Sequence, residues 1–249
     1  MKKCSIMKYI YILTYDLCTK LKSEMEQNMV IDNNEIRAFL FDLDGTLIDT
    51  ESIYREIWPR AIKEMGYEMK LEQYLELRSL GRPYAPLKMK EWYGEDFDYD
   101  FARKIRKRYF DEHIKKYGIE RKKGAVELLE HLRNNEITTA ITTATDIDRA
   151  TEYLNMTGLY GYFDKLISAT MVDEGKPSPK VYLHALKELG LKALECIVVE
   201  DAPNGIISAY NAGLKVIMVP DQTGLEDYLE PMLYACVDSL TDIMEVIGC

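Results

Sequence analysis

The sequence of 249 residues has few cysteines, and they show no paired arrangement. The cysteines are odd in number, lie far apart and include no Cys-x-x-Cys pair: Cys4, Cys18, Cys196, Cys236 and Cys249. Neither a disulfide framework nor a zinc site is therefore indicated. We expect a protein of the reducing cytoplasm.

An excess of positive charge is also absent. Lys and Arg number 32 against 42 Asp and Glu, so the formal net charge is −10. An acidic surface repels the phosphate backbone of nucleic acids, and we therefore expect no nucleic-acid partner. With 14 Gly and 8 Pro the chain is neither collagen-like nor low in complexity, and its length suffices for one large domain or two smaller ones.

No apolar run is long enough to span a membrane, and a secretory signal peptide is not expected either. Residues 1–20 start with basic residues and contain several apolar ones, but Lys8 interrupts the run and Asp16 follows it closely. No small-x-small cleavage site is present. We expect residues 1–34 to form an N-terminal extension, poorly ordered or derived from an upstream start, with the folded part beginning near Met29.

Short apolar runs alternate with helical patterns along most of the chain. Strands are predicted at 36–41, 137–143, 163–168, 196–199 and 215–219, and helices at 125–134, 179–189 and 204–212. Ser178 and Pro179 predict one helix start, while Gly190 and Gly213 stand where helices end. This alternation predicts an α/β protein with a doubly wound parallel sheet.

The region 51–122 contains helical patterns and no strand-like run. Helices are predicted at 51–65 and 69–93, and a third around residues 97–117 has aromatic and apolar residues every fourth position: Phe97, Phe101, Ile105, Tyr109 and His113. We therefore expect a helical cap domain, 51–122, inserted into an α/β core that comprises residues 35–50 and 123–249.

Polar residues follow the predicted strands, where an open parallel sheet binds its ligands. They are Asp42, Asp44 and Gly45 after the first strand, Thr143 at the end of the second, Lys176 after the third, and Glu200 and Asp201 after the fourth. Crowded carboxylates repel one another unless a cation joins them, and a few oxygen ligands suit Mg²⁺. A calcium loop beginning at Asp42 would need Gly and Glu where Leu47 and Ile53 stand.

These residue types suit phosphoryl transfer. A carboxylate such as Asp42 can form an acyl phosphate that water then cleaves, and Asp44 can protonate the leaving oxygen and later deprotonate the water. Thr143 and Lys176 would hold phosphate oxygens, and the acidic pair after the fourth strand would position Mg²⁺. Each signal alone also fits an ordinary turn, surface lysine or helix end. Their order after successive strands favours a shared site.

Four segments resemble the haloacid dehalogenase superfamily: FDLDGTLIDTE at 41–51, the threonine ending the second strand, GKPSPKVY at 175–182 and VVEDAPNGI at 198–206. The resemblance covers residues 36–245. The helical insertion resembles the cap of the subgroup that includes β-phosphoglucomutase and small sugar-phosphate and nucleotide phosphatases.

The resemblance implies a role for each matching residue. Asp42 would be the nucleophile and a metal ligand, and Asp44 the general acid and base, which also binds Mg²⁺ through its backbone carbonyl. Asp201 would be a further ligand and Glu200 would act on the metal through water. Thr143 and Lys176 would bind phosphate, and Gly45 would let the loop turn tightly beneath the substrate.

Two positions narrow the expected activity within this family. Dehalogenases of the superfamily generally lack an acidic residue where Asp44 stands, so phosphoryl transfer is favoured. The mutases usually carry a histidine twelve residues after the nucleophile, where this chain has Tyr54. Substrate contacts from the cap are predicted at Glu51, Tyr54, Gly81 and Arg82, although Tyr54 also fits helix packing and Arg82 a solvated surface. Trp58 and Trp92 are predicted in the core of the cap.

The leading hypothesis is a Mg²⁺-dependent phosphatase that hydrolyses a small phosphate monoester, a sugar phosphate or nucleotide, through an aspartyl-phosphate intermediate. The alternatives are a phosphomutase, which would release an isomer instead of phosphate, and a non-catalytic phosphate-binding module, which would have lost a motif residue. The expected partner is a small phosphorylated metabolite, without nucleic acid or membrane, and the expected state is a monomer or weak dimer.

Overall fold

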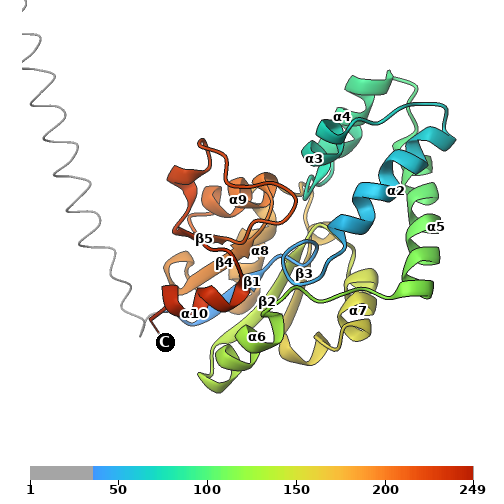
Figure 1. The fold of residues 1–249 in the computed structure, drawn as a ribbon. Coiled ribbons are helices and arrows are strands. Elements are labelled where there is room, and N and C mark those ends of the chain that lie inside the picture. Colours follow the sequence, from blue (N-terminus) through green and yellow to red (C-terminus); the bar gives the residue numbers. More distant parts are fainter. Residues whose placement is uncertain (1–35, 249) are drawn as a thin grey trace, which may run out of the picture. The chain divides into compact units, whose positions relative to one another are not determined.

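A computed structural model describes residues 36–248, which form a parallel six-stranded sheet in the order β3-β2-β1-β4-β5-β6 (Figure 1). The strands are β1 (Ala38–Phe41), β2 (Thr138–Thr143), β3 (Lys165–Ser168), β4 (Cys196–Glu200), β5 (Lys215–Met218) and β6 (Ala235–Cys236). The predicted fold class is confirmed, and the five predicted strands are found within two residues of their expected bounds. The strand β6 was not predicted because two residues are too short to show a pattern. The predictions for residues 1–34 lie outside the described residues.

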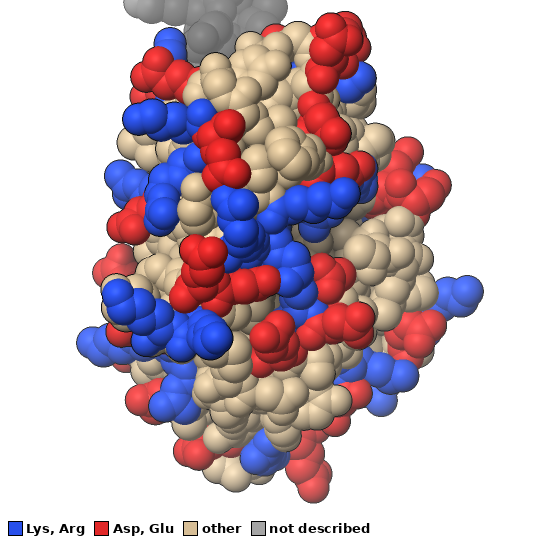
Figure 2. Space-filling view, turned by 90° about the vertical axis from the view of Figure 1, so that its right-hand side faces the viewer, with Lys and Arg blue, Asp and Glu red and all other residues tan. Residues whose placement is uncertain are grey.

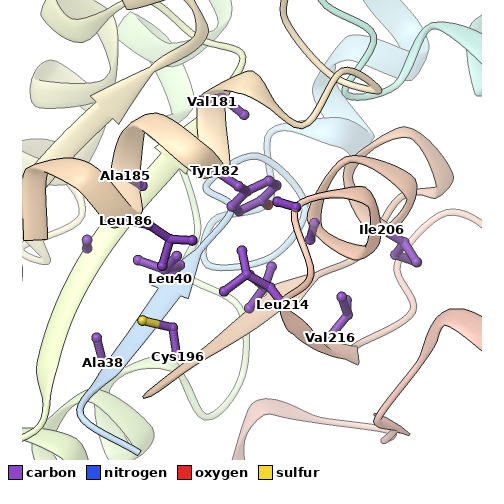
Figure 3. Packing of buried hydrophobic residues seen from close by; sticks show 14 of the residues in the cluster. Ala38, Leu40, Val181, Tyr182, Ala185, Leu186, Cys196, Ile206, Leu214 and Val216 are labelled. Carbon is purple, nitrogen blue, oxygen red and sulfur yellow. The ribbon is translucent and has the colours of Figure 1, made fainter. Parts of the chain in front are cut away.

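One face of the sheet is covered by α8 (Lys180–Leu189) and α9 (Pro203–Asn211), which pack against each other. Leu40, Val198 and Val216 point to this side from three neighbouring strands, because side chains alternate between the faces of a strand. They meet Tyr182 of α8 and Ile206 of α9 in the apolar core shown in Figure 3.

The opposite face is apolar as well, and it faces α6 (Ala125–Asn134), α7 (Ile147–Met156) and the short α10 (Ile243–Val246). Phe39 and Phe41 point to this side and stack with their ring centroids 5.9 Å apart. Both faces are buried, as expected when right-handed crossovers place helices on each side of a parallel sheet. Short 3₁₀ turns complete the connections at Tyr160–Tyr162, Ala169–Met171, Ala193–Glu195, Glu230–Met232 and Leu240–Asp242.

The helix boundaries show where local signals decide and where they do not. Gly190 and Gly213 have positive φ values of 67° and 78°, as predicted for residues that end helices. The helix α8 begins at Lys180, with Pro179 and not Ser178 at the N-cap. Ser178 instead accepts a hydrogen bond through its backbone oxygen from the hydroxyl of Ser208.

Four helices lie between β1 and α6 in the chain, and Figure 1 shows them on the side of the molecule away from α6: α2 (Glu51–Glu64), α3 (Leu71–Leu77), α4 (Tyr84–Tyr93) and α5 (Tyr99–Tyr117). We call them the helical insertion. The single helix predicted over residues 69–93 is wrong, because residues 78–83 separate α3 from α4. Pro83 is the N-cap residue of α4.

The predicted apolar face of the third insertion helix is also partly wrong. Phe97 precedes α5 and Phe101 is half-exposed to solvent, whereas Ile105 of the predicted face is buried. Ala102, Phe110 and Ile114 complete the buried side, so the face that packs near α2 overlaps only in part with the residues at every fourth position. Within residues 36–248, no helix combines the length and apolar character needed to cross a membrane.

Candidate active site

The sheet reverses its direction of winding between β1 and β4, which lie side by side although many residues separate them in the chain. Such a switch point leaves a crevice at the carboxyl ends of the two strands. Asp42 directly follows β1, Glu200 is the last residue of β4 and Asp201 comes next. The topology therefore brings these three carboxylates together.

The carboxylates of Asp42, Glu200 and Asp201 form a buried cluster. Each contributes an oxygen, and these oxygens all lie within 4.8 Å of one another. Burial, together with the neighbouring carboxylates, raises the pKa of Asp42 and of Asp201 well above the usual range, although Lys176 and Arg78 act in the opposite direction. Asp42 Oδ2 and Glu200 Oε2 are buried without a hydrogen-bond partner. Hard oxygen donors with unpaired, buried lone pairs fit a divalent cation such as Mg²⁺.

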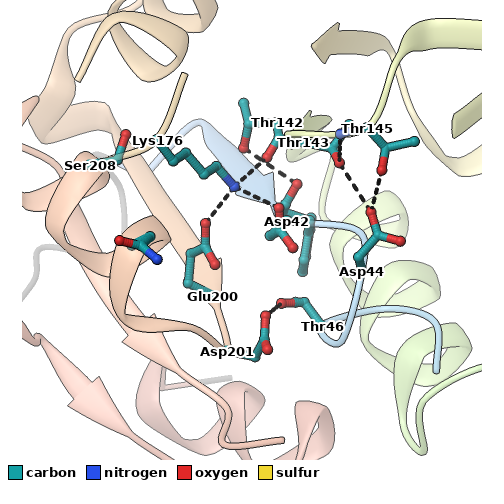
Figure 4. A network of polar contacts seen from close by, with 12 residues as sticks. Asp42, Asp44, Thr46, Thr142, Thr143, Thr145, Lys176, Glu200, Asp201 and Ser208 are labelled. Atoms are coloured by element: carbon teal, nitrogen blue, oxygen red, sulfur yellow. Dashed lines mark hydrogen bonds and ion pairs between the residues drawn. The ribbon is translucent and has the colours of Figure 1, made fainter. Parts of the chain in front are cut away.

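Lys176 places its ammonium directly between two members of this cluster (Figure 4). Its Nζ lies 2.6 Å from Asp42 Oδ1, 2.6 Å from Glu200 Oε1 and 2.9 Å from the carbonyl oxygen of Thr142. Burial opposes the charge on Lys176, but the two carboxylates outweigh it and raise its pKa well above the usual value. The hydroxyl of Tyr182 donates to the same Glu200 oxygen at 2.6 Å. Lys176 therefore neutralises the carboxylates that crowd this edge.

Two glycines allow the backbone to approach the cluster. Gly45 has φ +87°, and a Cβ atom there would lie 2.6 Å from Asp201 Oδ2. A Cβ atom on Gly205 would lie only 2.0 Å from Glu200 Oε1. Both positions therefore require glycine, the first because of its backbone conformation as well. Thr46 adds a hydrogen bond from its hydroxyl to Asp201 Oδ1 at 3.1 Å.

Asp44 points away from the three clustered carboxylates and toward hydroxyl groups (Figure 4). Thr50 donates to Asp44 Oδ1 at 2.6 Å, and Thr145 and Thr143 donate to Oδ2 at 2.7 and 3.4 Å. These donors orient a carboxyl group that borders the pocket. The structure thus places Thr143 beside Asp44, and its predicted contact with phosphate stays a prediction.

Arg78 was not among the predicted site residues, yet it is buried against the cluster. Its Nη1 lies 3.4 Å from Asp201 Oδ2, and its Nη2 donates to the hydroxyl of Thr223 at 2.7 Å. Asn204 holds the same loop by donating to the Arg78 carbonyl oxygen at 2.9 Å. No spacing rule in the sequence indicates this contact, because it joins residues that lie 123 positions apart.

A pocket of about 420 Å³ opens beside Asp42 and Asp44 and extends beneath the helical insertion. Its volume lies in the range that small-molecule sites occupy. All four predicted cap residues line it: Glu51, Tyr54, Gly81 and Arg82. Arginines and aromatic residues make up much of the remaining wall: Trp58, Tyr74, Arg78, Tyr99, Arg103, Arg106 and Arg149.

Glu51 and Tyr54 lie on the first turn of α2, which begins at the edge of the site. Tyr74 donates its hydroxyl proton to Glu51 Oε2 at 2.5 Å, and burial raises the pKa of Glu51 to about 7. Tyr54 stacks on Phe110 at a centroid distance of 4.5 Å, and its hydroxyl lies 3.4 Å from that of Tyr153. Tyr54 therefore both packs within the insertion and borders the pocket.

Gly81 and Arg82 lie in the loop between α3 and α4, which contacts the loop after β3. Gly81 N donates to the Lys176 carbonyl oxygen at 2.8 Å, and Gly175 N donates to the Arg82 carbonyl oxygen at 2.7 Å. A Cβ atom on Gly81 would lie 2.7 Å from the Cα atom of Gly175. The guanidinium of Arg82 is half-exposed and pairs with Asp100.

The two tryptophans differ. Trp58 is 5% exposed and borders the pocket, whereas Trp92 is only half-buried and packs beside Tyr93. The prediction that Trp92 belongs to a buried core is therefore wrong.

The hydroxyl of Thr145 was not predicted as part of the site, although the sequence contains a signal for it. Thr145 stands two residues after Thr143, just beyond the same hydroxyl-rich strand end. The sequence contains no such signal for the pocket residues Arg103, Arg106 and Arg149.

The site thus combines an aspartate after β1, a buried lysine and an acidic pair after β4 at one switch point. This combination defines a class of α/β enzymes that use carboxylates for their chemistry. A family model described as haloacid dehalogenase-like hydrolase matches residues 39–219. The chain belongs to this family and is a hydrolase. The family resemblance predicted from the motifs is confirmed.

Curated relatives match over most of their own length. Hexitol phosphatase A from Escherichia coli is 32% identical over 183 residues, which cover 74% of this chain and 82% of the relative. The phosphorylated carbohydrates phosphatase of Thermotoga maritima is 31% identical over 188 residues, 73% of this chain and 84% of the relative. The crystal structure of β-phosphoglucomutase from Clostridium difficile superposes with a TM-score of 0.73 at 23% identity, covering 86% of this chain and 97% of that one. This last similarity supports the fold.

Proposed function

We propose that the protein is a Mg²⁺-dependent phosphatase that hydrolyses a small phosphate monoester through an aspartyl-phosphate intermediate. The observation that carries the proposal is the state of the Asp42 carboxylate. One oxygen is bound by Lys176, whereas the other has no hydrogen-bond partner, and the residue borders the pocket. A carboxylate with one restrained oxygen and one free oxygen is suited to attack a bound phosphoryl group.

The reaction divides into two displacements at phosphorus. In the first, Asp42 Oδ2 forms a bond to phosphorus and the ester P–O bond breaks, while protonated Asp44 gives its proton to the departing oxygen. In the second, Asp44 takes a proton from water as the water oxygen attacks phosphorus, and the bond to Asp42 breaks to release inorganic phosphate. The hydroxyl groups of Thr50 and Thr145 hold Asp44 in place for both proton transfers.

Asp42, Asp201 and the backbone carbonyl of Asp44 would hold Mg²⁺, with Glu200 acting through water. The ion, when bound, supplies positive charge that offsets the charge of the phosphoryl group. Lys176 contributes a permanent cation to the same region, and Thr143 a hydroxyl for a phosphate oxygen. The unpaired buried oxygen of Glu200 and the close approach of the three carboxylates support this assignment.

The helical insertion acts in this proposal as a cap over the pocket, and Glu51, Tyr54, Gly81 and Arg82 contact the leaving group. Both relatives described above carry names that specify phosphatases of sugar alcohols or carbohydrates. These names support a small phosphorylated metabolite as the substrate. We further propose that the enzyme works in the cytoplasm as a monomer or weak dimer.

The test is phosphate release from a panel of sugar phosphates, nucleotides and an aryl phosphate, with Mg²⁺ and with a chelator. We expect release that the chelator abolishes and that Asp42→Asn lowers by at least about 1,000-fold, because an amide cannot form the acyl phosphate. A melting curve checks that the variant folds. Turnover of Asp42→Asn near that of the wild type would contradict the assignment.

The same experiment separates the alternatives. If a sugar phosphate is converted to its isomer without phosphate release, the protein is a phosphomutase and not a phosphatase, despite the tyrosine at position 54. Binding of phosphate esters with neither release nor isomerisation would indicate a phosphate-binding module.

A further inference from the structure

Two arginines of α5 face the pocket without a charged partner. Tyr99, Arg103 and Arg106 all line the pocket, and their spacing of four and three residues places them on one side of the helix. Both arginine side chains are half-buried, and neither makes a hydrogen bond or ion pair with any side chain or carbonyl in the described range 36–248. Arg106 Nε is buried and unpartnered.

The other arginines of the pocket have charged partners, although Arg78 Nε is buried and unpartnered as well. Arg78 pairs with Asp201, Arg82 with Asp100, and Arg149 with both the Tyr153 hydroxyl and Asp111. The carboxylates on the pocket wall are Asp42, Asp44, Glu51, Asp146 and Asp173, and within residues 36–248 none forms an ion pair with Arg103 or Arg106. The charge on this part of the wall is therefore uncompensated.

Keeping two guanidinium groups together in a partly dry pocket costs free energy, because each is desolvated and the charges repel. Burial and the neighbouring Arg106 and Arg82 lower the pKa of Arg103, while Tyr99 and Asp146 act in the opposite direction. An anion between the two arginines would relieve both effects. Arginine is suited to this task because its planar donors bind carboxylate and phosphate groups in pairs.

Arg106 is also held in place. Its guanidinium lies 4.7 Å from the ring centroid of Tyr54 and 4.9 Å from that of Trp58. Tyr54 is stacked on Phe110, and Trp58 on Tyr99, with centroid distances of 4.5 and 6.4 Å. These rings restrict the arginine without using its hydrogen-bond donors. Because the rings already pack against one another and against Arg106, they are poorly placed to stack on a nucleobase.

The outer side of α5 provides a contrast within the same helix. Lys104, Lys107, Arg108 and Lys115 line a shallow groove there together with Asp111 and Glu112. Lys107 pairs with Asp111, and Arg108 with Glu64. On the face of the molecule in Figure 2, Lys and Arg side chains lie among Asp and Glu side chains in the same way. Lys107 and Arg108 on the solvent side thus form ion pairs, whereas Arg103 and Arg106 in the pocket form none within residues 36–248.

We infer that Arg103 and Arg106 bind a second anionic group of the substrate, a carboxylate or second phosphate carried by the leaving group. The inference rests on the proposed function, in which the first phosphate occupies the site beside Asp42. The pocket extends from Asp42 to these arginines within one volume of about 420 Å³, so a small metabolite can contact both ends. The favoured substrate is then a phosphorylated sugar acid or a bisphosphate, and not a sugar phosphate whose single phosphate is its only anionic group.

The test compares matched substrates that differ only in the second charge. The pairs are glycerol phosphate and phosphoglycerate, a hexitol phosphate and the matching phosphogluconate, and fructose monophosphate and fructose bisphosphate. We expect the wild type to favour the doubly anionic member of at least one pair in kcat/KM. Arg103→Gln and Arg106→Gln should each lower that preference by about 10- to 100-fold. The pair that shows the effect distinguishes a carboxylate from a phosphate.

Matched variants provide the controls. Arg108→Gln removes a charge from the same helix outside the pocket and should leave the preference unchanged, whereas Arg103→Lys and Arg106→Lys should retain part of it. Melting curves identify any variant that fails to fold. A wild type that favours the doubly anionic member of no pair overturns the inference. The inference is also overturned if the preference for the doubly anionic substrate is unchanged in both Arg103→Gln and Arg106→Gln.

A binding experiment separates this inference from the proposed function. Asp42→Asn is titrated calorimetrically with the same pairs of compounds, with and without Arg103→Gln. If no compound releases phosphate in the wild type, the proposed function fails, but tighter binding of the doubly anionic members would still support the anion site. Equal affinity within every pair would overturn the anion site even if phosphate is released.

Discussion

The two halves of the pocket are built differently. On the core side, Asp42, Lys176, Glu200 and Asp201 are at most 1% exposed, and their contacts are short. On the insertion side, the guanidinium of Arg82 is half-exposed and those of its neighbours on α5 are half-buried. The core side is a buried network of ion pairs that leaves two carboxylate oxygens free. The insertion side keeps donors free for a ligand.

This difference indicates that the two sides of the pocket have different roles. A dry, crowded carboxylate cluster is costly to assemble, and it suits chemistry that every substrate shares. In the proposed function, a wall with free arginines and packed aromatic rings would distinguish one leaving group from another. The two halves meet at the backbone contacts of Gly81 with Lys176 and of Arg82 with Gly175. Substitutions in each half should therefore differ in size and kind.

The largest effect on folding is expected from Lys176→Met. Removing the ammonium leaves Asp42 and Glu200 buried without it, which should lower the free energy of unfolding by about 3–5 kcal/mol. The pKa of Asp42, already raised, should rise further, so the folded state binds protons more tightly than the unfolded state. The loss should consequently be larger at pH 8 than at pH 5. Denaturant titrations with chelator at both pH values measure it.

Lys180→Met is the control for this prediction. Lys180 lies four residues away, is partly exposed and pairs with Asp173 and Glu174 at the surface. It should change stability far less than Lys176→Met does, because water screens the surface ion pairs. Equal losses in the two variants would show that the buried network is no stronger than a surface ion pair.

Gly81→Ala should weaken the junction between the two halves. The added Cβ atom would lie 2.7 Å from Gly175 Cα, so the loop between α3 and α4 must move and both backbone hydrogen bonds there lengthen. We expect a loss of about 1–3 kcal/mol in stability and a raised KM. Gly161→Ala is the control, because nothing lies within 4 Å of its Cβ position. An unchanged KM would separate this loop from substrate binding.

Glu51→Gln should change how stability depends on pH. The pKa of Glu51 is raised from 4.5 to about 7, so the folded protein holds a proton that the unfolded chain releases, and stability falls as pH rises through this window. The variant lacks this loss. Its stability relative to the wild type should increase by up to about 3 kcal/mol between pH 4 and pH 8.

Glu64→Gln, on the same helix, tests the sign of that effect. Hydrogen bonds from Tyr109 and Arg108 lower the pKa of Glu64, so its contribution to stability is present at neutral pH and lost in acid. Denaturant titrations across the same pH range should therefore show a change of the opposite direction. If stability changed with pH in the same direction in both variants, burial would be excluded as the cause of the raised pKa of Glu51.

The smallest effect is expected for Asp111→Asn. Asp111 of α5 lies 3.4 Å from the guanidinium of Arg149 on α7 and is 41% exposed, so water screens the pair. We expect a loss below about 1 kcal/mol that disappears at high salt. Thermal melting at low and high salt measures it. A loss above about 2 kcal/mol would mean that the halves are joined more tightly than this exposure indicates.

Much of the core side could be predicted from the sequence. Apolar runs that alternate with helical patterns indicate a parallel sheet, and residues after successive strands meet at one edge of such a sheet. The positions of Asp42, Lys176, Glu200 and Asp201 follow from this rule, which needs only strand ends and chain direction. The helical insertion was recognised as helical, but the break at residues 78–83 and the buried face of α5 were not.

The remaining features depend on which helix face turns inward, and no local spacing encodes that. Arg78 reaches Asp201 across 123 residues, while Arg103 and Arg106 look in the sequence like the solvent-exposed cations beside them on α5. The packing of α5 against α2 decides that these two enter the pocket and that Arg108 does not. The sequence thus determines which residues follow successive strands and form the carboxylate cluster. The tertiary packing of distant helices decides which arginines enter the pocket, and with them the proposed selectivity.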